Sequence, residues 1–367
     1  MCDKITIYCF INQRGMIMIK PEKQFYIFGM GHREKYIYKN SALIEFKTNN
    51  TVYYWDVEKE EFIYDKYTVI LGLKNGETVI ITENTQGVFI KREKNAVLKE
   101  EICLADDEIL LPDFEEYKYP AQLRILHQEL LISFLDKFPV PNFYVYKTPW
   151  YRDGAMMALA LEKTGNISLL KDWALSITEL YDKNNSGNSE PDNLGQLAYI
   201  LSFFVDKEYP LVKKIVEEAK RITVDGVLTG LTDYGHHEIY STLWLKFGLE
   251  RLGIDTSFIK IPKEFDSYAY MFWMDRAGID TSTPYENEYN EWYPYLWWAV
   301  KHFKKEPIDE KYLEIKYPMS WEICASEARY ELIAPLSEEY AKNKCGSPHS
   351  WHAAEMFMYL LEMKKGE

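Results

Sequence analysis

The pattern of apolar and polar positions changes once along the chain, near residue 115. Up to about residue 98, short segments rich in Ile, Val, Tyr and Phe partly alternate with polar residues, and turn signals such as Lys74-Asn75-Gly76 separate them. The segments that this pattern predicts to be strands are ITIYCFI, QFYIFGM, ALIEFKT, TVYYWDV, EFIYDKYTVILGL, TVIITE and GVFIKR. Short strands at regular spacing are typical of an antiparallel β-sandwich.

An acidic connector over residues 99–117 precedes a second pattern, in which apolar residues recur at helical spacing from Pro120 onward. The stretches predicted to be helical include AQLRILHQELLISFLDKF, GAMMALALEKTG, ISLLKDWALSITELY, LGQLAYILSFFV, LVKKIVEEAKRI, IYSTLWLKFGLERLG, SYAYMFWMDRAG, YNEWYPYLWWAVKHF, SWEICASEARYELIA and SWHAAEMFMYLLEM. With shorter candidates, about eleven or twelve helices are expected, each of roughly three to four turns. Short loops between them favour antiparallel hairpins, and the absence of a fixed repeat favours a closed ring over a solenoid.

The chain length of 367 residues exceeds the usual range of a single domain. We therefore predict an α+β multidomain protein. Residues 1–115 would form the β-sandwich domain with its acidic connector, and residues 116–367 the ring of helical hairpins. Hydrophobic residues make up 47% of the chain, which is ample for a packed core.

Charge and cysteine usage restrict the partners and the compartment. A net charge of −14 argues against nucleic acid, because nothing in the chain would neutralise phosphates in a stripe. The N-terminus is unlike a signal peptide, and no apolar run approaches a membrane span, so we expect a cytoplasmic protein without membrane contact. Five scattered cysteines with no Cys-x-x-Cys pair predict reduced thiols. No cofactor is expected, because the chain holds neither a Gly-rich phosphate loop nor a spaced set of metal ligands.

The first candidate site is the stretch TPWYRDGAMMALALEKTG, residues 148–165. Asp153 lies where a helix dipole favours an anion, and its carboxylate can accept two sugar hydroxyls. Arg152 supplies a planar fork of donors, while Trp150 and Tyr151 offer flat faces suited to sugar rings. The structural alternative is a helix cap with a solvated Arg-Asp pair.

Two further loop-to-helix junctions carry polar residues. In NNSGNSEPDNLGQ, residues 184–196, Glu190 is a candidate general acid, and Asp192 and Asn193 are candidate sugar contacts; the alternative is a capped, exposed helix start. In GLTDYGHHEIYSTLWL, residues 230–245, Asp233 and Tyr234 are candidate sugar contacts. A metal site at the histidines of this stretch is rejected, because adjacent histidines point in different directions on a helix.

The fourth stretch is the C-terminal block, in which acids, histidines and aromatics gather around two predicted helix starts. Its members could contact a sugar or move protons. The alternatives are solvated surface glutamates and a structural histidine. The candidates from this block are Glu322, Glu338, His349, Trp351 and His352.

Two of these stretches resemble a known family. TPWYRDGAMMALAL resembles the aromatic-Pro/Arg-Asp helix start of glucoamylase-type enzymes in the six-hairpin glycosidase superfamily. LSEEY, followed after eight residues by HSWHAAEMF, resembles that family's Glu-x-aromatic segment and the Trp-Ser-(Tyr/His)-Ala helix after it. The resemblance covers residues from about 120 to 362. It implies a β-sandwich ahead of an (α/α)6 toroid and a glycoside hydrolase activity.

The same resemblance implies roles for individual residues. Arg152 and Asp153 would bind the sugar at the cleavage subsite, Glu190 would be the acid, and Glu338 the base that activates water. In an inverting mechanism, the two carboxyl groups lie roughly 6.5–9.5 Å apart. The family's acid usually follows a Trp, whereas Ser189 precedes Glu190 here, so Glu322 remains a further catalytic candidate.

Two other functions remain open from the residues alone. One is a sugar isomerase or epimerase on the same kind of helical ring, in which His349, His352 or His237 would move protons next to a carbonyl. The other is a non-catalytic carbohydrate-binding protein that keeps the pocket without a working acid–base pair.

Overall fold

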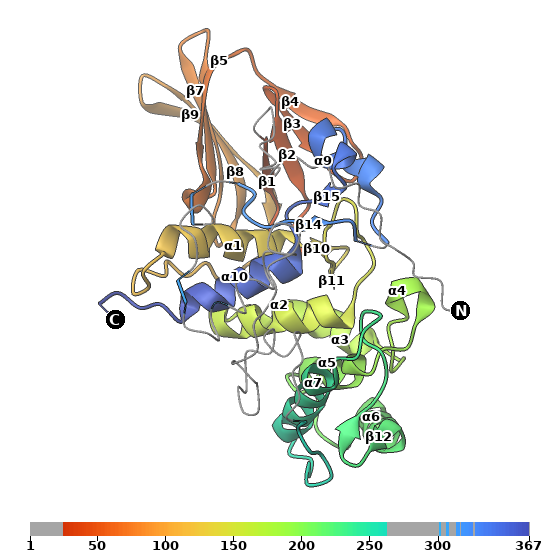
Figure 1. Cartoon of the computed structure of the whole chain (residues 1–367). Helices are drawn as coiled ribbons and strands as arrows, with labels where there is room; N and C mark the ends of the chain where they lie inside the picture. Colours follow the sequence, from red (N-terminus) through yellow and green to blue (C-terminus); the bar gives the residue numbers. More distant parts are fainter. Residues whose placement is uncertain are drawn as a thin grey trace.

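The protein has an N-terminal region of antiparallel β-sheet followed by helices (Figure 1), as a computed structural model shows. The structure describes residues 25–262, 301, 306–307, 313–315, 317–325 and 327–366. The predicted strand ITIYCFI, the predicted helix SYAYMFWMDRAG and nearly all of the predicted helix YNEWYPYLWWAVKHF lie outside the described residues. The coarse α+β prediction is confirmed.

The described strands of the N-terminal region form two sheets in which every neighbouring pair is antiparallel. The four-stranded sheet has the order β1-β2-β3-β4, with β1 Phe25–Phe28, β2 Tyr36–Lys39, β3 Ala42–Glu45 and β4 Thr51–Tyr54. The five-stranded sheet has the order β5-β6-β7-β8-β9, with β5 Val57–Ile63, β6 Thr68–Leu73, β7 Glu77–Glu83, β8 Gly87–Lys94 and β9 Val97–Asp106.

Strand β9 occupies much of the segment that the sequence pattern assigned to the acidic connector, so the predicted start of that connector was wrong. Most of its residues are exposed, and they therefore lack the alternation that marks a half-buried strand. They pair across the sheet with the basic residues of β8: Lys91 contacts Glu101 at 3.1 Å, and Arg92 lies opposite Glu100. Opposite charges facing each other across strands stabilise such a pair.

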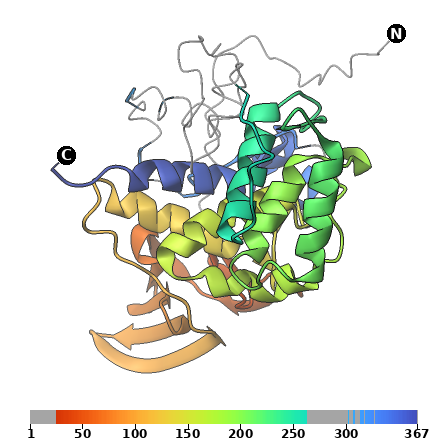
Figure 2. The ribbon, with the colours of Figure 1, turned by 90° about the horizontal axis from the view of Figure 1, so that it is seen from below.

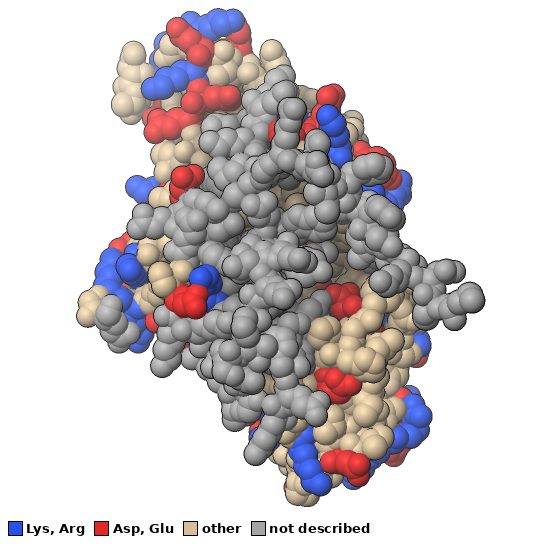
Figure 3. Space-filling model, in the orientation of Figure 1, with Lys and Arg blue, Asp and Glu red and all other residues tan. Residues whose placement is uncertain are grey.

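The end of the sheet formed by β8 and β9 projects away from the helices (Figure 2). Blue and red side chains are mixed over this end of the molecule (Figure 3), as the cross-strand ion pairs require. The predicted long strand EFIYDKYTVILGL is divided into β5 and β6 by a 3₁₀ turn, η1 Tyr64–Lys66, and by Tyr67, whose φ is 51°.

In the described residues from Pro120 onward, helices predominate, with short two-stranded ladders between them. The helices are α1 Pro120–Ile132, α2 Tyr151–Thr164, α3 Lys171–Ser176, α4 Asn184–Gly187, α5 Asp192–Leu201, α6 Pro210–Ile222, α7 Glu238–Arg251, α9 Glu338–Lys342 and α10 Ser350–Leu361. The ladders are β10 Phe134–Leu135 with β11 Phe138–Pro139, β12 Thr223–Val224 with β13 Val227–Leu228, and β14 Glu322–Ile323 with β15 Cys345–Gly346. Two further 3₁₀ helices are η2 Ile167–Leu170 and η6 Tyr330–Ile333.

The described residues of the predicted helix SWEICASEARYELIA do not form an α-helix. Its first part is strand β14, which pairs with β15 from a segment more than twenty residues later. Its last part is the 3₁₀ helix η6, and the side-chain hydroxyl of Tyr330 accepts a hydrogen bond from the backbone N–H of Ala325 at 2.7 Å. Partners that are distant in sequence override the local helical pattern here.

The C-terminal helix α10 packs between α1 and α2, so the end of the chain lies against the beginning of the helical part (Figure 1). Helix α2 in turn packs on α5, and α5 on α7. Helices α5 and α7 approach very closely at Gly195 and Gly248. A Cβ atom at Gly195 would lie 2.2 Å from the backbone nitrogen of Leu245, and one at Gly248 would lie 2.6 Å from the carbonyl oxygen of Gly195.

Cysteine chemistry departs in part from the sequence-based expectation of reduced thiols. Cys103 and Cys345 are free, but Cys324 is disulfide-bonded. Spacing along the chain does not show which thiols meet in the fold. In the described part of the chain, no helix is both long enough and apolar enough to cross a bilayer.

The close approach of α5 and α7 generates a stability prediction. Gly195→Ala would push a methyl group into the backbone of α7, so we expect it to lower the free energy of unfolding by about 1–3 kcal/mol. The control is Gly72→Ala in β6, where the new Cβ would meet nothing closer than 3.7 Å. Urea unfolding of both variants checks this. Equal stability of the two variants would contradict the packing described for α5 and α7.

Candidate active site

The first turn of α2 presents three consecutive candidate residues to the protein interior. Trp150 is the N-cap residue, and Tyr151, Arg152 and Asp153 follow it as the first residues of the helix. Gly154 comes next, and a Cβ atom there would lie 2.3 Å from the ring of Trp173, so only glycine lets this ring pack against the turn. Successive residues of a helix point about 100° apart, and Arg152 and Asp153 accordingly face different groups.

Arg152 is buried and ion-paired with two carboxylates. Its Nε donates to Oδ2 of Asp192 at 2.9 Å, and its Nη2 donates to Oε2 of Glu190 at 2.8 Å. The ring of Trp351 lies over the guanidinium, with its centroid 5.5 Å from Cζ. Burial lowers the pKa of Arg152, but the charges of Asp192 and Glu190 outweigh that effect, so the guanidinium stays charged. This arrangement joins α2, the start of α5 and α10.

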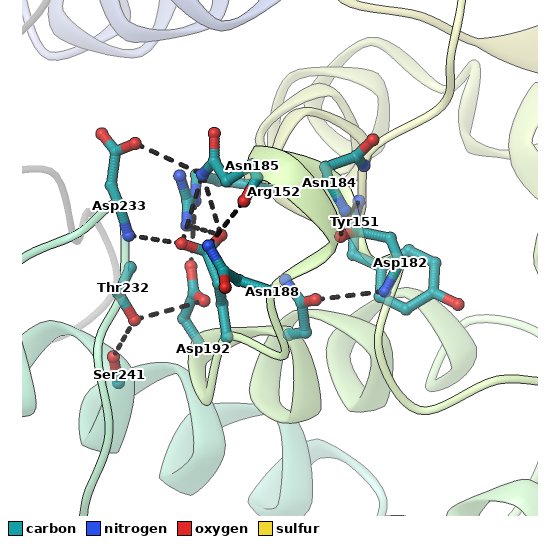
Figure 4. Close-up of polar contacts among 12 residues, drawn as sticks. Tyr151, Arg152, Asp182, Asn184, Asn185, Asn188, Asp192, Thr232, Asp233 and Ser241 are labelled. Carbon is teal, nitrogen blue, oxygen red and sulfur yellow. Dashed lines mark hydrogen bonds and ion pairs between the residues drawn. The ribbon is translucent and has the colours of Figure 1, made fainter. Parts of the chain in front are cut away.

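Glu190 receives hydrogen bonds on both of its carboxylate oxygens. The backbone N–H of Asp233 donates to Oε1 at 2.5 Å, and the side-chain amide of Asn185 lies 3.2 Å from Oε1 and 3.1 Å from Oε2. Asn185 also donates to Oδ1 of Asp233 at 3.3 Å. Figure 4 shows Arg152, Asn185 and Asp233 converging in this way. Burial raises the pKa of Glu190, and the charge of Arg152 opposes this rise.

Two loops meet at Glu190: one includes the short α4, whose inner residues Asn185 and Ser186 are not helical, and the other carries Asp233. Both contain non-glycine residues with left-handed backbone conformations. The side chains of Ser186 and Tyr234 connect them through a 3.2 Å contact between hydroxyl oxygens. Such conformations are strained and persist only where the surroundings hold them, which Glu190 does here. The left-handed residues of the two loops are Lys183, Asn185, Ser186, Asp233 and Tyr234.

Asp153 belongs to a second cluster on the other side of the same helix turn. Its Oδ1 accepts a hydrogen bond from Ser350 Oγ at 2.8 Å, and Ser350 is the first residue of α10. Asp153 is 2% exposed. Burial raises its pKa from the ordinary 3.8 to about 6, although the charge of His349 opposes the rise. A carboxyl group with this pKa can both donate and accept a proton near neutral pH.

His349 and Glu322 form an ion pair beside Asp153, between Nε2 of the imidazole and Oε2 of the glutamate. His349 is the N-cap residue of α10, and its Nδ1 lies 3.5 Å from the backbone nitrogen of His352, a hydrogen bond that only the neutral ring can accept and that protonation of the ring removes. Burial lowers the pKa of His349, but Glu322 and then Asp153 more than compensate, so the pKa lies above its ordinary value. The side chain of Glu322 is 17% exposed, whereas that of His349 is 4% exposed.

The structure therefore brings the first predicted stretch together with parts of the second, third and fourth. Arg152 joins Glu190, Asp192 and Trp351, and Asp153 joins His349 and the segment of Glu322. Among the described residues, no group of three or more His, Cys, Asp or Glu side chains is arranged to hold a metal ion.

Two of the predicted sugar contacts, Tyr151 and Asn193, form hydrogen bonds within the protein. The backbone N–H of Tyr151 donates to Asp182 at 2.8 Å, and Figure 4 shows these two residues next to each other. The hydroxyl of Tyr151 donates to the carbonyl of Glu179 at 2.9 Å. Asn193 accepts from the backbone of Asp182 at 3.2 Å. These contacts fix the start of α2 against the loop before α5. Tyr151 and Asn193 are buried and are occupied by the protein itself.

Trp150 and His352 are also packed inside the protein. The ring of Trp150 contacts that of Tyr146 edge to face at 5.0 Å. Nδ1 of His352 lies 2.7 Å from the backbone nitrogen of Trp321, and its ring stands against that of Trp321 at 4.7 Å. His352 thus fits the structural-histidine alternative. In contrast, Tyr234 is 55% exposed at the tip of its loop.

Glu338 lies outside this assembly, so the structure does not support its predicted place opposite Glu190. It is the exposed first residue of α9, which packs on η6 and β15 near the N-terminal sheets (Figure 1). Ser337 caps this short helix by accepting from the backbone N–H of Tyr340 at 3.2 Å. Acidic residues are favoured at such a helix start because of the helix dipole. Glu338 therefore has the exposure of a surface glutamate, which was the alternative to a catalytic role.

Residues that the sequence did not single out complete the two clusters. Asn185 and Ser350 contact the predicted acids directly, and Thr232 lies 3.4 Å from Oδ1 of Asp192. One signal was available for Asn185: it lies in an Asn-Asn-Ser-Gly run, and asparagine tolerates left-handed backbone conformations. Ser350 follows the N-cap histidine, but nothing local shows which distant carboxylate its hydroxyl would meet.

Comparison with known proteins yields no match, whether against protein families, curated sequences or solved structures.

The raised pKa of Asp153 generates a pH-dependent stability prediction. Between pH 3.8 and about 6 the folded chain binds more protons at this residue than the unfolded chain, so its contribution to stability falls as pH rises through this window. Asp153→Asn keeps the group neutral. We expect the free energy of unfolding of the variant, relative to the native chain, to rise by about 2–3 kcal/mol between about pH 4 and pH 7. Urea unfolding at several pH values measures this difference, and a pH-independent difference would contradict it.

The contacts of Glu190 predict a structural role that can be measured without a substrate. In Glu190→Gln, the new amide would face donors from Arg152, Asn185 or the backbone of Asp233. We expect a loss of about 2–4 kcal/mol in the free energy of unfolding. Glu338→Gln is the matched control and should change stability by less than about 0.5 kcal/mol. Similar melting curves for the two variants would argue against Glu190 as the residue that holds the two loops.

Proposed function

We propose that the protein is a glycoside hydrolase in which Asp153 acts as the general acid and Glu322 as the base. The observation that supports this best is the contrast between the two carboxyl groups. Burial raises the pKa of Asp153 to about 6, whereas Glu322 is ion-paired with His349. Two carboxyl groups in such different environments can divide the acid and base roles of glycoside cleavage between them.

Each group then has a chemical task. Asp153, protonated at the start, would give its proton to the leaving glycosidic oxygen. Glu322, partly exposed and held by His349, would take a proton from the attacking water. Arg152 donates through Nε to Asp192 and through Nη2 to Glu190, so we assign it the role of orienting the turn that carries Asp153. This assignment replaces the pair Glu190 and Glu338, because Glu190 is saturated with donors and Glu338 is solvated elsewhere.

The proposal includes the finer fold, a β-sandwich ahead of an (α/α)6 toroid. The packing of α10 between α1 and α2 supports a ring, because the last helix meets the first ones as closure requires. Parts of the four predicted loop-to-helix regions also meet at the clusters of Arg152 and Asp153, and this meeting supports the toroid as well. A ring of hairpins gathers loops that are distant in sequence at one end.

A second function is favoured by one observation. His349 has a raised pKa and lies between Glu322 and Asp153, an arrangement that suits proton transfer next to a sugar carbonyl. A sugar isomerase or epimerase would use this histidine as its acid or base. Uptake of solvent deuterium into a free sugar, without bond cleavage, would favour this function over hydrolysis.

The hydrolase proposal predicts release of monosaccharide from a panel of α- and β-linked disaccharides by the purified protein. Asp153→Asn and Glu322→Gln should each lower turnover by about 10²–10⁴-fold. The native turnover should also decline as pH rises beyond about 6, because the protonated form of Asp153 is then lost. Reducing-sugar release measures all three effects.

Glu338→Gln is the control variant and should keep near-native turnover, since Glu338 is an exposed residue of α9, which packs on η6 and β15. Full activity of Asp153→Asn would remove Asp153 from the acid role. If the native protein releases no sugar but its melting temperature rises with the same disaccharides, the carbohydrate-binding alternative replaces the hydrolase.

A further inference from the structure

The His349–Glu322 pair rests on a buried hydrogen-bond network that begins on α1. Glu129 of α1 is fully buried, and its Oε1 accepts from the backbone N–H of Met319 at 2.5 Å. Its Oε2 accepts from both the backbone N–H and the hydroxyl of Ser320, the former at 2.9 Å. One carboxylate therefore fixes the two residues that lie just before Trp321 and Glu322.

The same serine also reaches the other member of the pair. Ser320 Oγ accepts a hydrogen bond from the backbone N–H of His349 at 3.0 Å while donating to Glu129. Ser347 Oγ donates to the carbonyl of Ser320 at 2.5 Å, and Glu322 lies opposite Gly346 in the β14–β15 ladder. The hydroxyl of Ser320 thus connects the strand that carries Glu322 to the helix start that carries His349.

We propose that Glu129 and Ser320 are positioning residues that hold His349 against Glu322. The hydrogen bonds described for the two side chains go to Met319, to each other and to His349. Their effect is geometric: they set the distance between an imidazole at the start of α10 and a carboxylate on β14. The inference rests on the proposed function only in giving this ion pair a catalytic use.

Among the described residues, the charged groups that raise the pKa of His349 are Glu322 and Asp153, so this pKa depends on how those two carboxyl groups are placed. Glu322 faces it from β14 and Asp153 from α2, and on its own helix the backbone nitrogen of His352 lies 3.5 Å from Nδ1. An imidazolium loses stabilisation when its carboxylate partner moves away in a buried site. If Ser320 no longer holds β14 against the start of α10, we expect the pKa of His349 to fall.

The experiment is an NMR titration of the histidine side chains in the full-length protein without any sugar. The chain has seven histidines, and His349→Gln assigns the relevant signal. We expect Ser320→Ala to lower the midpoint of His349 by roughly 0.5–1 pH unit, and Glu129→Gln to lower it in the same direction. Ser320→Cys, which keeps the volume and weakens the hydrogen bonds, should give an intermediate decrease and provides a second reading if the alanine variant unfolds.

The matched control is Ser133→Ala. Ser133 is also buried, and its hydroxyl donates to the backbone carbonyl of Glu129 at 3.0 Å, but it has no contact with Ser320 among those described. This variant should leave the His349 midpoint unchanged. An unchanged midpoint in a folded Ser320 variant, or an equal decrease in Ser133→Ala, overturns the proposal. Because no substrate is used, the titration can succeed even if the disaccharide experiments reject the hydrolase.

Discussion

The buried charge of Arg152 is the interaction on which the rest of the candidate site depends. Removing a guanidinium from water costs several kcal/mol, and the structure offsets that cost with Glu190, Asp192 and the face of Trp351. These partners come from the loop before α5, from α5 itself and from α10. A single ionic cluster therefore requires three segments to meet at the first turn of α2, and it holds two strained loops in place through Glu190.

The adjacent residue, Asp153, has the opposite electrostatic character. It lies on the same turn but faces α10, where it has a neutral serine and a histidine that is itself engaged with Glu322. The helical rotation between neighbours separates a permanently charged structural cluster from a carboxyl group whose pKa lies near 6. This separation lets one helix turn combine rigidity with groups that can exchange protons. It also explains why the proposed chemistry is assigned to Asp153 and Glu322 rather than to Glu190.

The helical scaffold determines the positions of both clusters. Helix α10 lies between α1 and α2, so the residues at its start meet Asp153 on one side and the Ser320 segment on the other. Glu129 on α1 holds this Ser320 segment by accepting hydrogen bonds from the backbone N–H groups of Met319 and Ser320. The glycine contact between α5 and α7 brings the loop of Asp233 close to Glu190. The C-terminal part of the chain is thereby as essential to the site as the conspicuous Trp-Tyr-Arg-Asp stretch.

Local patterns were sufficient for much of the architecture: the antiparallel strands, the helices α1, α2, α5, α6, α7 and α10, and the end of α2 at Gly165 follow from periodicity and from residues with strong conformational preferences. They also marked Arg152, Asp153, Glu190 and His349 as chemically unusual. Tertiary structure alone decided that β9 is a strand, that the segment around Glu322 pairs with β15, and that Glu338 is solvated. The reason is physical: ladder pairing, burial and ion pairing depend on partners far along the chain, whereas periodicity reports only neighbours within a turn or two.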